Sequence, residues 1–123
     1  MPVTFAIDHE RRLVHARAEG VVRVKDIEAF LDAVAVENAL PYRKLFDGRG
    51  AIGRYDAADI AVLSARVNTL SHIDRRGALA LVTSPRYAAL ADRFVVLVSS
   101  GRPARAFLDE DEARRWLEEQ PEA

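Results

Sequence analysis

The stretch Ala78-Leu79-Ala80-Leu81-Val82 decides the fold class, because all five residues are apolar. A continuous apolar run of this length is typical of a strand in a parallel sheet, where both faces are covered. Before it, Ile60, Leu63, Val67 and Leu70 predict a helix over about 57–71, and after it Ser84-Pro85 is a typical helix start. A strand between two helices is the repeating unit of an α/β domain.

The first 40 residues extend this pattern toward the N-terminus. Apolar and other residues alternate over 3–7, and a second strand is predicted over 13–18 after the charged turn 8–12. A turn this short joins antiparallel strands, because parallel strands need a long crossover. A helical stripe then follows and ends before Pro41, made of Ile27, Phe30, Leu31 and Val34. Residues 42–47 predict the next strand.

The last third holds one ambiguous segment. The β-branched run Phe94–Val98 is compatible with a helix or a strand, and we favour a helix that continues to a C-cap at Gly101. Residues 105–108 predict a final strand. Asp109, with Glu112 three positions on, then resembles the start of a capped helix.

The predicted element order is therefore ββαβαβαβα, in a single domain over residues 1–123. Strands that alternate with helices imply right-handed crossovers and a mostly parallel sheet. We expect five strands, with the first pair an antiparallel hairpin at one edge, and about four helices.

Composition excludes several classes of protein. There are 18 basic and 19 acidic residues, so the chain lacks the excess of basic residues that is typical of proteins that bind nucleic acids. The absence of Cys excludes disulfides, thiolate zinc sites and Cys nucleophiles. The longest apolar run, Phe94–Val98, is far shorter than the roughly 20 residues of a membrane span, and no signal peptide is recognisable. We expect a cytoplasmic protein.

The whole pattern resembles the SpoIIAA-like (STAS-like) family over residues 5–117. The N-terminal hairpin, the strand ending Leu45-Phe46-Asp47-Gly48-Arg49-Gly50, and Ala106-Phe107-Leu108-Asp109 followed by Ala113 and Trp116-Leu117 carry the resemblance. It implies a mixed sheet, no known enzymatic activity, and in some members a similarity to lipid-carrying SEC14-type domains. Related anti-anti-sigma factors carry a phosphorylated Ser at a helix start, but the matching residues 54–59 hold no Ser or Thr.

Residues 48–53 spell G-x-G-x-x-G, which in a dinucleotide site brings backbone close to a pyrophosphate at a helix N-terminus. Here the helix begins only near Asp56, and no acidic residue ends the next strand. Glycines that serve backbone turns are the simpler interpretation.

A weaker hypothesis concerns the carboxyl edge of the sheet, where parallel α/β folds bind ligands. Loops 47–55, 83–87 and 109–112 are predicted to meet there. The candidate ligand-binding residues are Asp47, Gly48, Arg49, Gly50, Arg54, Ser84 and Arg86. They would bind a small anion or a nucleotide, although exposed arginines are more often solvated or salt-bridged.

No sequence feature predicts catalysis, a metal or a cofactor. The three histidines lie at no ligand spacing, and no Ser stands in a G-x-S-x-G motif. We therefore expect a non-catalytic regulatory or protein-interaction module. It would bind a protein partner or form a homodimer through the small residues Ala57, Ala58, Ala61 and Ala65. The alternative is a carrier or sensor of a small apolar or acyl ligand, which the Ala-rich composition disfavours because it favours tight packing.

Overall fold

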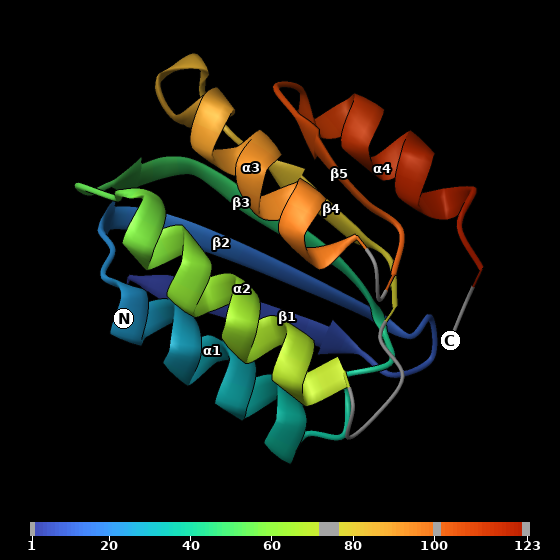
Figure 1. Cartoon of the computed structure of the whole chain (residues 1–123). Coiled ribbons are helices and arrows are strands. Elements are labelled where there is room, and N and C mark those ends of the chain that lie inside the picture. The colour runs from blue at the N-terminus through green and yellow to red at the C-terminus, as the bar shows by residue number, and fades with distance from the viewer. Residues whose placement is uncertain (1, 72–76, 100–101, 122–123) are drawn as a thin grey trace.

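In the described part of the chain, five strands form one mixed sheet with four α-helices on its faces (Figure 1). The computed structural model describes residues 2–71, 77–99 and 102–121. The strands are β1 (Val3–Asp8), β2 (Leu13–Val21), β3 (Arg43–Ile52), β4 (Leu79–Val82) and β5 (Ala104–Phe107). The helices are α1 (Val24–Val36), α2 (Ala57–Ser71), α3 (Ala88–Val98) and α4 (Glu110–Glu118), with a 3₁₀ turn η1 (Pro85–Tyr87) before α3. The α/β class and the element order agree with the sequence prediction.

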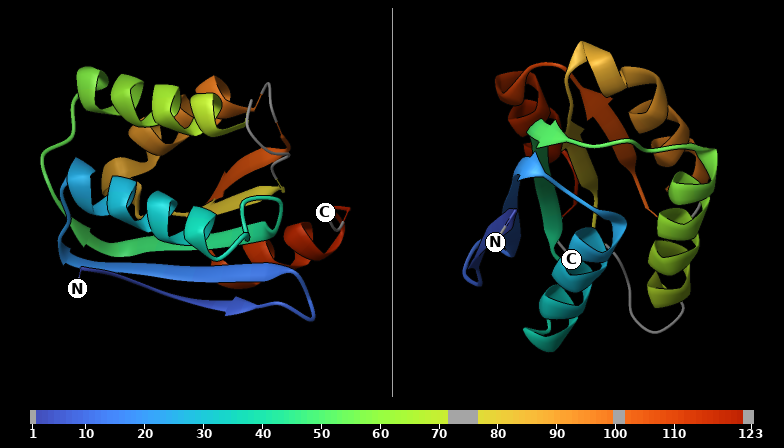
Figure 2. Two further views of the ribbon diagram at one scale, coloured as in Figure 1. Left: turned by 90° about the horizontal axis from the view of Figure 1, so that it is seen from below. Right: turned by 90° about the vertical axis from the view of Figure 1, so that its left-hand side faces the viewer.

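The strands lie side by side in chain order, β1-β2-β3-β4-β5. The β1–β2 pair is antiparallel, and the three other pairs are parallel. Because each parallel crossover has the same hand and advances in the same direction, α1, α2 and α3 lie on one face of the sheet. The last helix, α4, lies on the other face (Figure 2).

The strand predicted over 42–47 is longer in the structure, because β3 continues to Ile52. Residues 48–52 are thus strand and not loop. The extension pairs with the second half of β2, in which Glu19 aligns with Gly50 after a register shift that follows Arg17. Glycine suits this place because a Cβ on Gly50 would lie 3.2 Å from the Glu19 side chain.

The predicted helices agree with the structure, with one local difference. Phe94–Val98 lies within α3, and Asp109 caps α4 by accepting a hydrogen bond from the Glu112 N–H at 3.1 Å. Ser84 makes no side-chain cap: its carbonyl instead accepts the Tyr87 N–H, which closes η1 before α3 begins. The predicted C-cap Gly101 lies outside the described residues.

Each face of the sheet has its own apolar core. The core under α4 contains Leu45, Ala80, Val82, Phe107, Ala113 and Leu117. The core on the opposite face joins β2 to α1 and includes Val14, Ala16, Phe30, Leu31 and Val34. In β4, Ala80 and Val82 are fully buried toward α4, whereas Leu79 and Leu81 on the other face are only half-buried. Leu79 and Leu81 are only half-buried because side chains do not completely fill the space between the sheet and helices α1 to α3.

Candidate functional site

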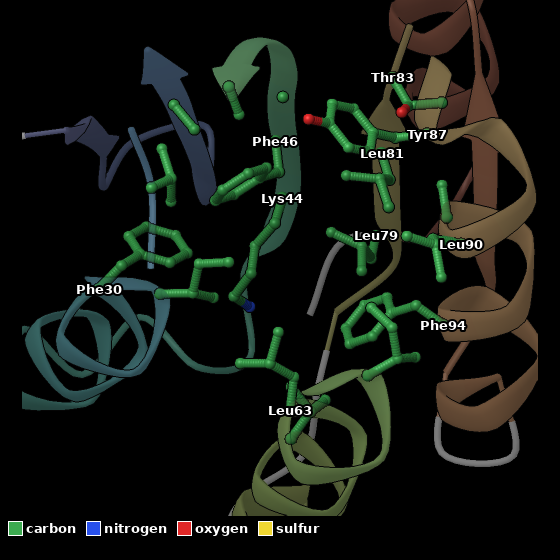
Figure 3. Close-up of a pocket in the computed structure, with 18 of the residues that line it drawn as sticks. Phe30, Lys44, Phe46, Leu63, Leu79, Leu81, Thr83, Tyr87, Leu90 and Phe94 are labelled. Carbon is green, nitrogen blue, oxygen red and sulfur yellow. The ribbon is translucent and has the colours of Figure 1, made fainter. Parts of the chain in front are cut away.

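A cavity of about 170 Å³ lies between the sheet and helices α1, α2 and α3 (Figure 3). Every element around it contributes apolar side chains, and most of them are bulky. They are Ile27, Phe30 and Leu31 from α1, Phe46, Leu79 and Leu81 from the sheet, Ile60, Leu63 and Val67 from α2, and Leu90, Ala91 and Phe94 from α3. A space with this mostly apolar lining can accept an apolar molecule.

The position of α2 creates the cavity. This helix packs mainly on α1 and α3, and Figure 2 shows it standing away from the strands. Its inward residues Ile60, Leu63 and Val67 are buried, although they line the cavity wall opposite the sheet. The helix therefore forms a roof over β3 and β4, and the space beneath it stays partly unfilled.

Two buried cations line the same cavity. Lys44 and Arg102 are each 5% exposed, and the Lys44 side chain extends from β3 beside the cavity (Figure 3). The Lys44 Nζ donates hydrogen bonds to the carbonyls of Leu40 at 2.6 Å and Tyr42 at 2.7 Å. These bonds tie the ammonium group to the segment between α1 and β3, which offsets part of the cost of its burial.

Two tyrosines hold the segment 53–56 that leads from β3 to α2. The Tyr87 hydroxyl donates to the Gly53 carbonyl at 2.8 Å and accepts from the Gly53 N–H at 3.1 Å. The Tyr55 hydroxyl donates to the Val22 carbonyl, and burial raises the pKa of this phenol. The two rings meet edge to face with centroids 5.8 Å apart. Both tyrosines also line the cavity, so this tyrosine pair forms its wall beside segment 53–56.

Gly53 is required by this arrangement and not by a phosphate. A Cβ at Gly53 would lie 2.6 Å from the Tyr55 ring, which is far closer than side chains tolerate. The other two glycines of the motif, Gly48 and Gly50, lie within β3. The structure therefore places the G-x-G-x-x-G letters mostly in a strand, without the loop from strand to helix that a dinucleotide fingerprint needs.

Of the predicted anion-binding residues, the structure joins Asp47 and Arg49. The buried Asp47 carboxylate accepts from Arg49 Nε at 3.0 Å and from Nη2 at 2.8 Å, and Arg17 Nε lies 3.7 Å away. The hydrogen bonds from Arg49 hold the pKa of Asp47 below its ordinary value. Arg49 also reaches Glu110 at 3.1 Å, which links β3 to the start of α4. Two carboxylates thus bind this guanidinium within the chain.

The remaining candidates lie apart from that pair. Arg86 stacks over the Tyr87 ring at 5.3 Å, Arg54 is exposed, and Ser84 is half-buried. Within the described residues, no hydrogen bond or ion pair connects Arg49 with any of these three. Anion binding at this edge stays a prediction.

A second polar cluster surrounds His15 on the α4 face of the sheet. Arg114 Nη2 lies 3.5 Å from His15 Nδ1 and its Nε donates to Glu110 at 3.0 Å. Burial, followed by the charge of Arg114, lowers the pKa of His15. His15 Nε2 is buried without a hydrogen-bond partner. The folded protein therefore favours a neutral imidazole here.

The sequence did not reveal the cavity, because core and cavity walls use the same apolar residues. The sequence pattern places Leu63, Leu81 and Phe94 in ordinary helix and strand core, and the many Ala residues favour close packing. The useful signal is the contrast within β4, where Leu79 and Leu81 alternate with the smaller Ala80 and Val82. Larger residues on the crossover-helix face are consistent with a wider gap there.

The described residues contain neither a metal-binding cluster nor a membrane-spanning helix. No group of three or more His, Asp or Glu side chains is placed to hold a metal ion within 2–71, 77–99 and 102–121. In the same ranges, every helix is too short or too polar to cross a bilayer.

Comparisons with known proteins define the fold. No family model matches the chain, and none of the curated proteins matches either. Among solved structures, the chain is similar to an uncharacterized protein of the DUF3478 family with a SpoIIAA-like fold from Shewanella loihica PV-4. The TM-score is 0.62 at 17% sequence identity, over 94% of this chain and 93% of that chain. The protein therefore has a SpoIIAA-like fold, as the sequence resemblance indicated.

Proposed function

We propose that this protein is a non-catalytic binding module that holds a small apolar ligand between its sheet and helices α1 to α3. The observation that supports this most is the cavity of about 170 Å³ and its bulky apolar lining. Of the two functions expected from the sequence, the ligand carrier or sensor is thus favoured over the interaction module.

Energetics support a ligand in this space. An apolar molecule that enters this space gains roughly 25 cal/mol for each Å² of apolar surface removed from water. Natural interiors rarely leave such a volume unfilled. A ligand that restores contacts to Leu63, Leu81 and Phe94 would recover much of this free energy.

Methyl NMR of the wild-type protein tests the proposal, with 1-hexanol as the probe. We expect saturable shifts of the methyl groups of Ile60, Leu63 and Leu81, which line the cavity. The methyls of Val36, which is 79% exposed, serve as the internal control and should stay unchanged. If all of these methyls respond equally, or none responds up to the solubility of hexanol, the cavity does not bind apolar molecules.

Self-association is the second candidate, because the small residues of α2 lie on its outer face. Ala57, Ala58, Ala61 and Ala65 are all exposed, and Val62 between them is 53% exposed. Sedimentation of wild type and Val62→Asp would test this. A dimer that the aspartate dissociates supports it, and a monomer at every concentration argues against it.

A further inference from the structure

We propose that the ligand is a neutral molecule with one aromatic ring or a short alkyl chain and at most one hydroxyl-type group, and that long acyl chains are excluded. This inference rests on the proposed apolar binding function. Among the apolar or acyl ligands expected from the sequence, it specifies the size and charge of the ligand and the residue that contacts its polar group.

Volume sets the size of the ligand. A dry cavity of about 150 Å³ is known to bind benzene, whereas drug-sized molecules occupy sites of roughly 300–1,000 Å³. The cavity here, about 170 Å³, therefore has room for slightly more than one benzene ring. Only a short part of a long acyl chain would fit in this space, and the rest of the chain would lie outside it in contact with water.

The walls favour an aromatic guest. Phe30, Phe46 and Phe94 all line the cavity, and Figure 3 shows the first two on one side of the space and the third on the opposite side. The rings of Phe30 and Phe46 already meet edge to face, with centroids 5.5 Å apart. A guest ring in the same space would add further edge-to-face contacts of this kind.

The polar atoms of the wall favour a neutral guest. Hydrogen bonds within the chain already use the hydroxyls of Tyr55 and Tyr87, and Lys44 Nζ already donates to two carbonyls. A neutral guest leaves all of these bonds intact, whereas a carboxylate would lose its hydration on entering a cavity whose wall is mostly apolar.

Thr83 is the contact for a single polar group. Its side chain is buried and lines the cavity, and Figure 3 shows its oxygen beside Tyr87. The hydroxyl donates to the Ser84 carbonyl over 3.5 Å, which is a long and weak hydrogen bond. It can therefore turn toward a guest hydroxyl at little cost.

Calorimetric titration of the wild-type protein with toluene, 4-methylphenol, benzoate and hexadecanoate tests the inference. We expect toluene and 4-methylphenol to bind at least tenfold more tightly than the other two. Tighter binding of hexadecanoate or benzoate would overturn the inference and leave the apolar binding function standing. If none of the four binds and hexanol also leaves the lining methyls unmoved, the proposed function itself fails.

Variants locate the binding and test the polar contact. Ala91→Leu fills the cavity from α3 and should weaken toluene binding at least tenfold, whereas Ala61→Leu on the exposed face of α2 should not. Gly48→Ala is a milder filling variant, because its new Cβ would approach no atom closer than 3.4 Å. Thr83→Val should weaken 4-methylphenol severalfold and leave toluene unchanged. Equal toluene affinity in wild type and in a folded Ala91→Leu or Gly48→Ala variant would refute the location.

Discussion

Replacing Tyr87 with Phe tests how segment 53–56 is held. The change removes one hydroxyl and keeps the ring that packs against Tyr55. The lost hydroxyl makes two hydrogen bonds, one to the N–H and one to the carbonyl of Gly53. A net hydrogen bond contributes about 1 kcal/mol, so Tyr87→Phe should lower the free energy of unfolding by about 2 kcal/mol. For a domain of this size, that is a fall in Tm of roughly 8 °C.

Urea denaturation measures the loss, and hydrogen exchange locates it. The amide of Gly53 should exchange faster in Tyr87→Phe, because its acceptor is gone. Tyr42→Phe is the matched control: among the residues that the structure describes, its hydroxyl bonds only to exposed His9, at 2.8 Å. We expect a loss below about 0.5 kcal/mol. An equal loss in both variants, or an unchanged exchange rate at Gly53, would refute the reasoning.

Three further predictions concern stability. Asp109→Ala removes the side-chain cap of α4 and should lower the free energy of unfolding, measured with denaturant, by about 1 kcal/mol. An unchanged free energy of unfolding would show that this hydrogen bond does not stabilise the protein. Gly77→Ala places a Cβ 2.4 Å from the Tyr42 backbone and should cost about 3 kcal/mol. Gly20→Ala should cost less, because φ is +75° there but a Cβ would point into open space among the described residues. The reverse order of the two losses would contradict the close approach at Gly77. Because the pKa of His15 is lowered from 6.5 in the fold, the unfolded chain takes up this proton first, so stability should fall as pH drops below about 6.5. The lowered pKa of Asp47 adds a second loss as pH drops below about 3.8, and His15→Gln should remove only the first loss in a pH series of thermal melts.

The fold was predictable because most local patterns agree with the tertiary structure. The apolar residues spaced along α2 predicted its bounds, 57–71, correctly. The preference for a helix over a strand at Phe94–Val98 was also correct. The predicted end of β3 at residue 47 was wrong, because Gly48 and Gly50 by themselves suggest a loop and not a strand. Pairing with the long β2 overrides that local preference, and such pairing is a long-range property.

The site was less predictable, for a related reason. The sequence placed Arg49, Arg54 and Arg86 together because each was predicted to lie in a loop at the same edge of the sheet. In the structure Arg49 belongs to strand β3, and its side chain binds Asp47 and Glu110 instead. The cavity depends on how far α2 stands from the sheet, a distance that no periodicity encodes. Tyr55 and Tyr87, which line its wall, carry no motif that marks them in advance.

The unfilled volume beneath α2 also has a mechanical consequence. Hydrostatic pressure favours whichever state occupies less total volume, and unfolding lets solvent enter voids that the native chain keeps empty. Because the volume change of unfolding scales with the void volume of the native protein, the space of about 170 Å³ should add to it. We therefore expect the protein to be sensitive to compression, and a molecule bound beneath α2 to make it more resistant.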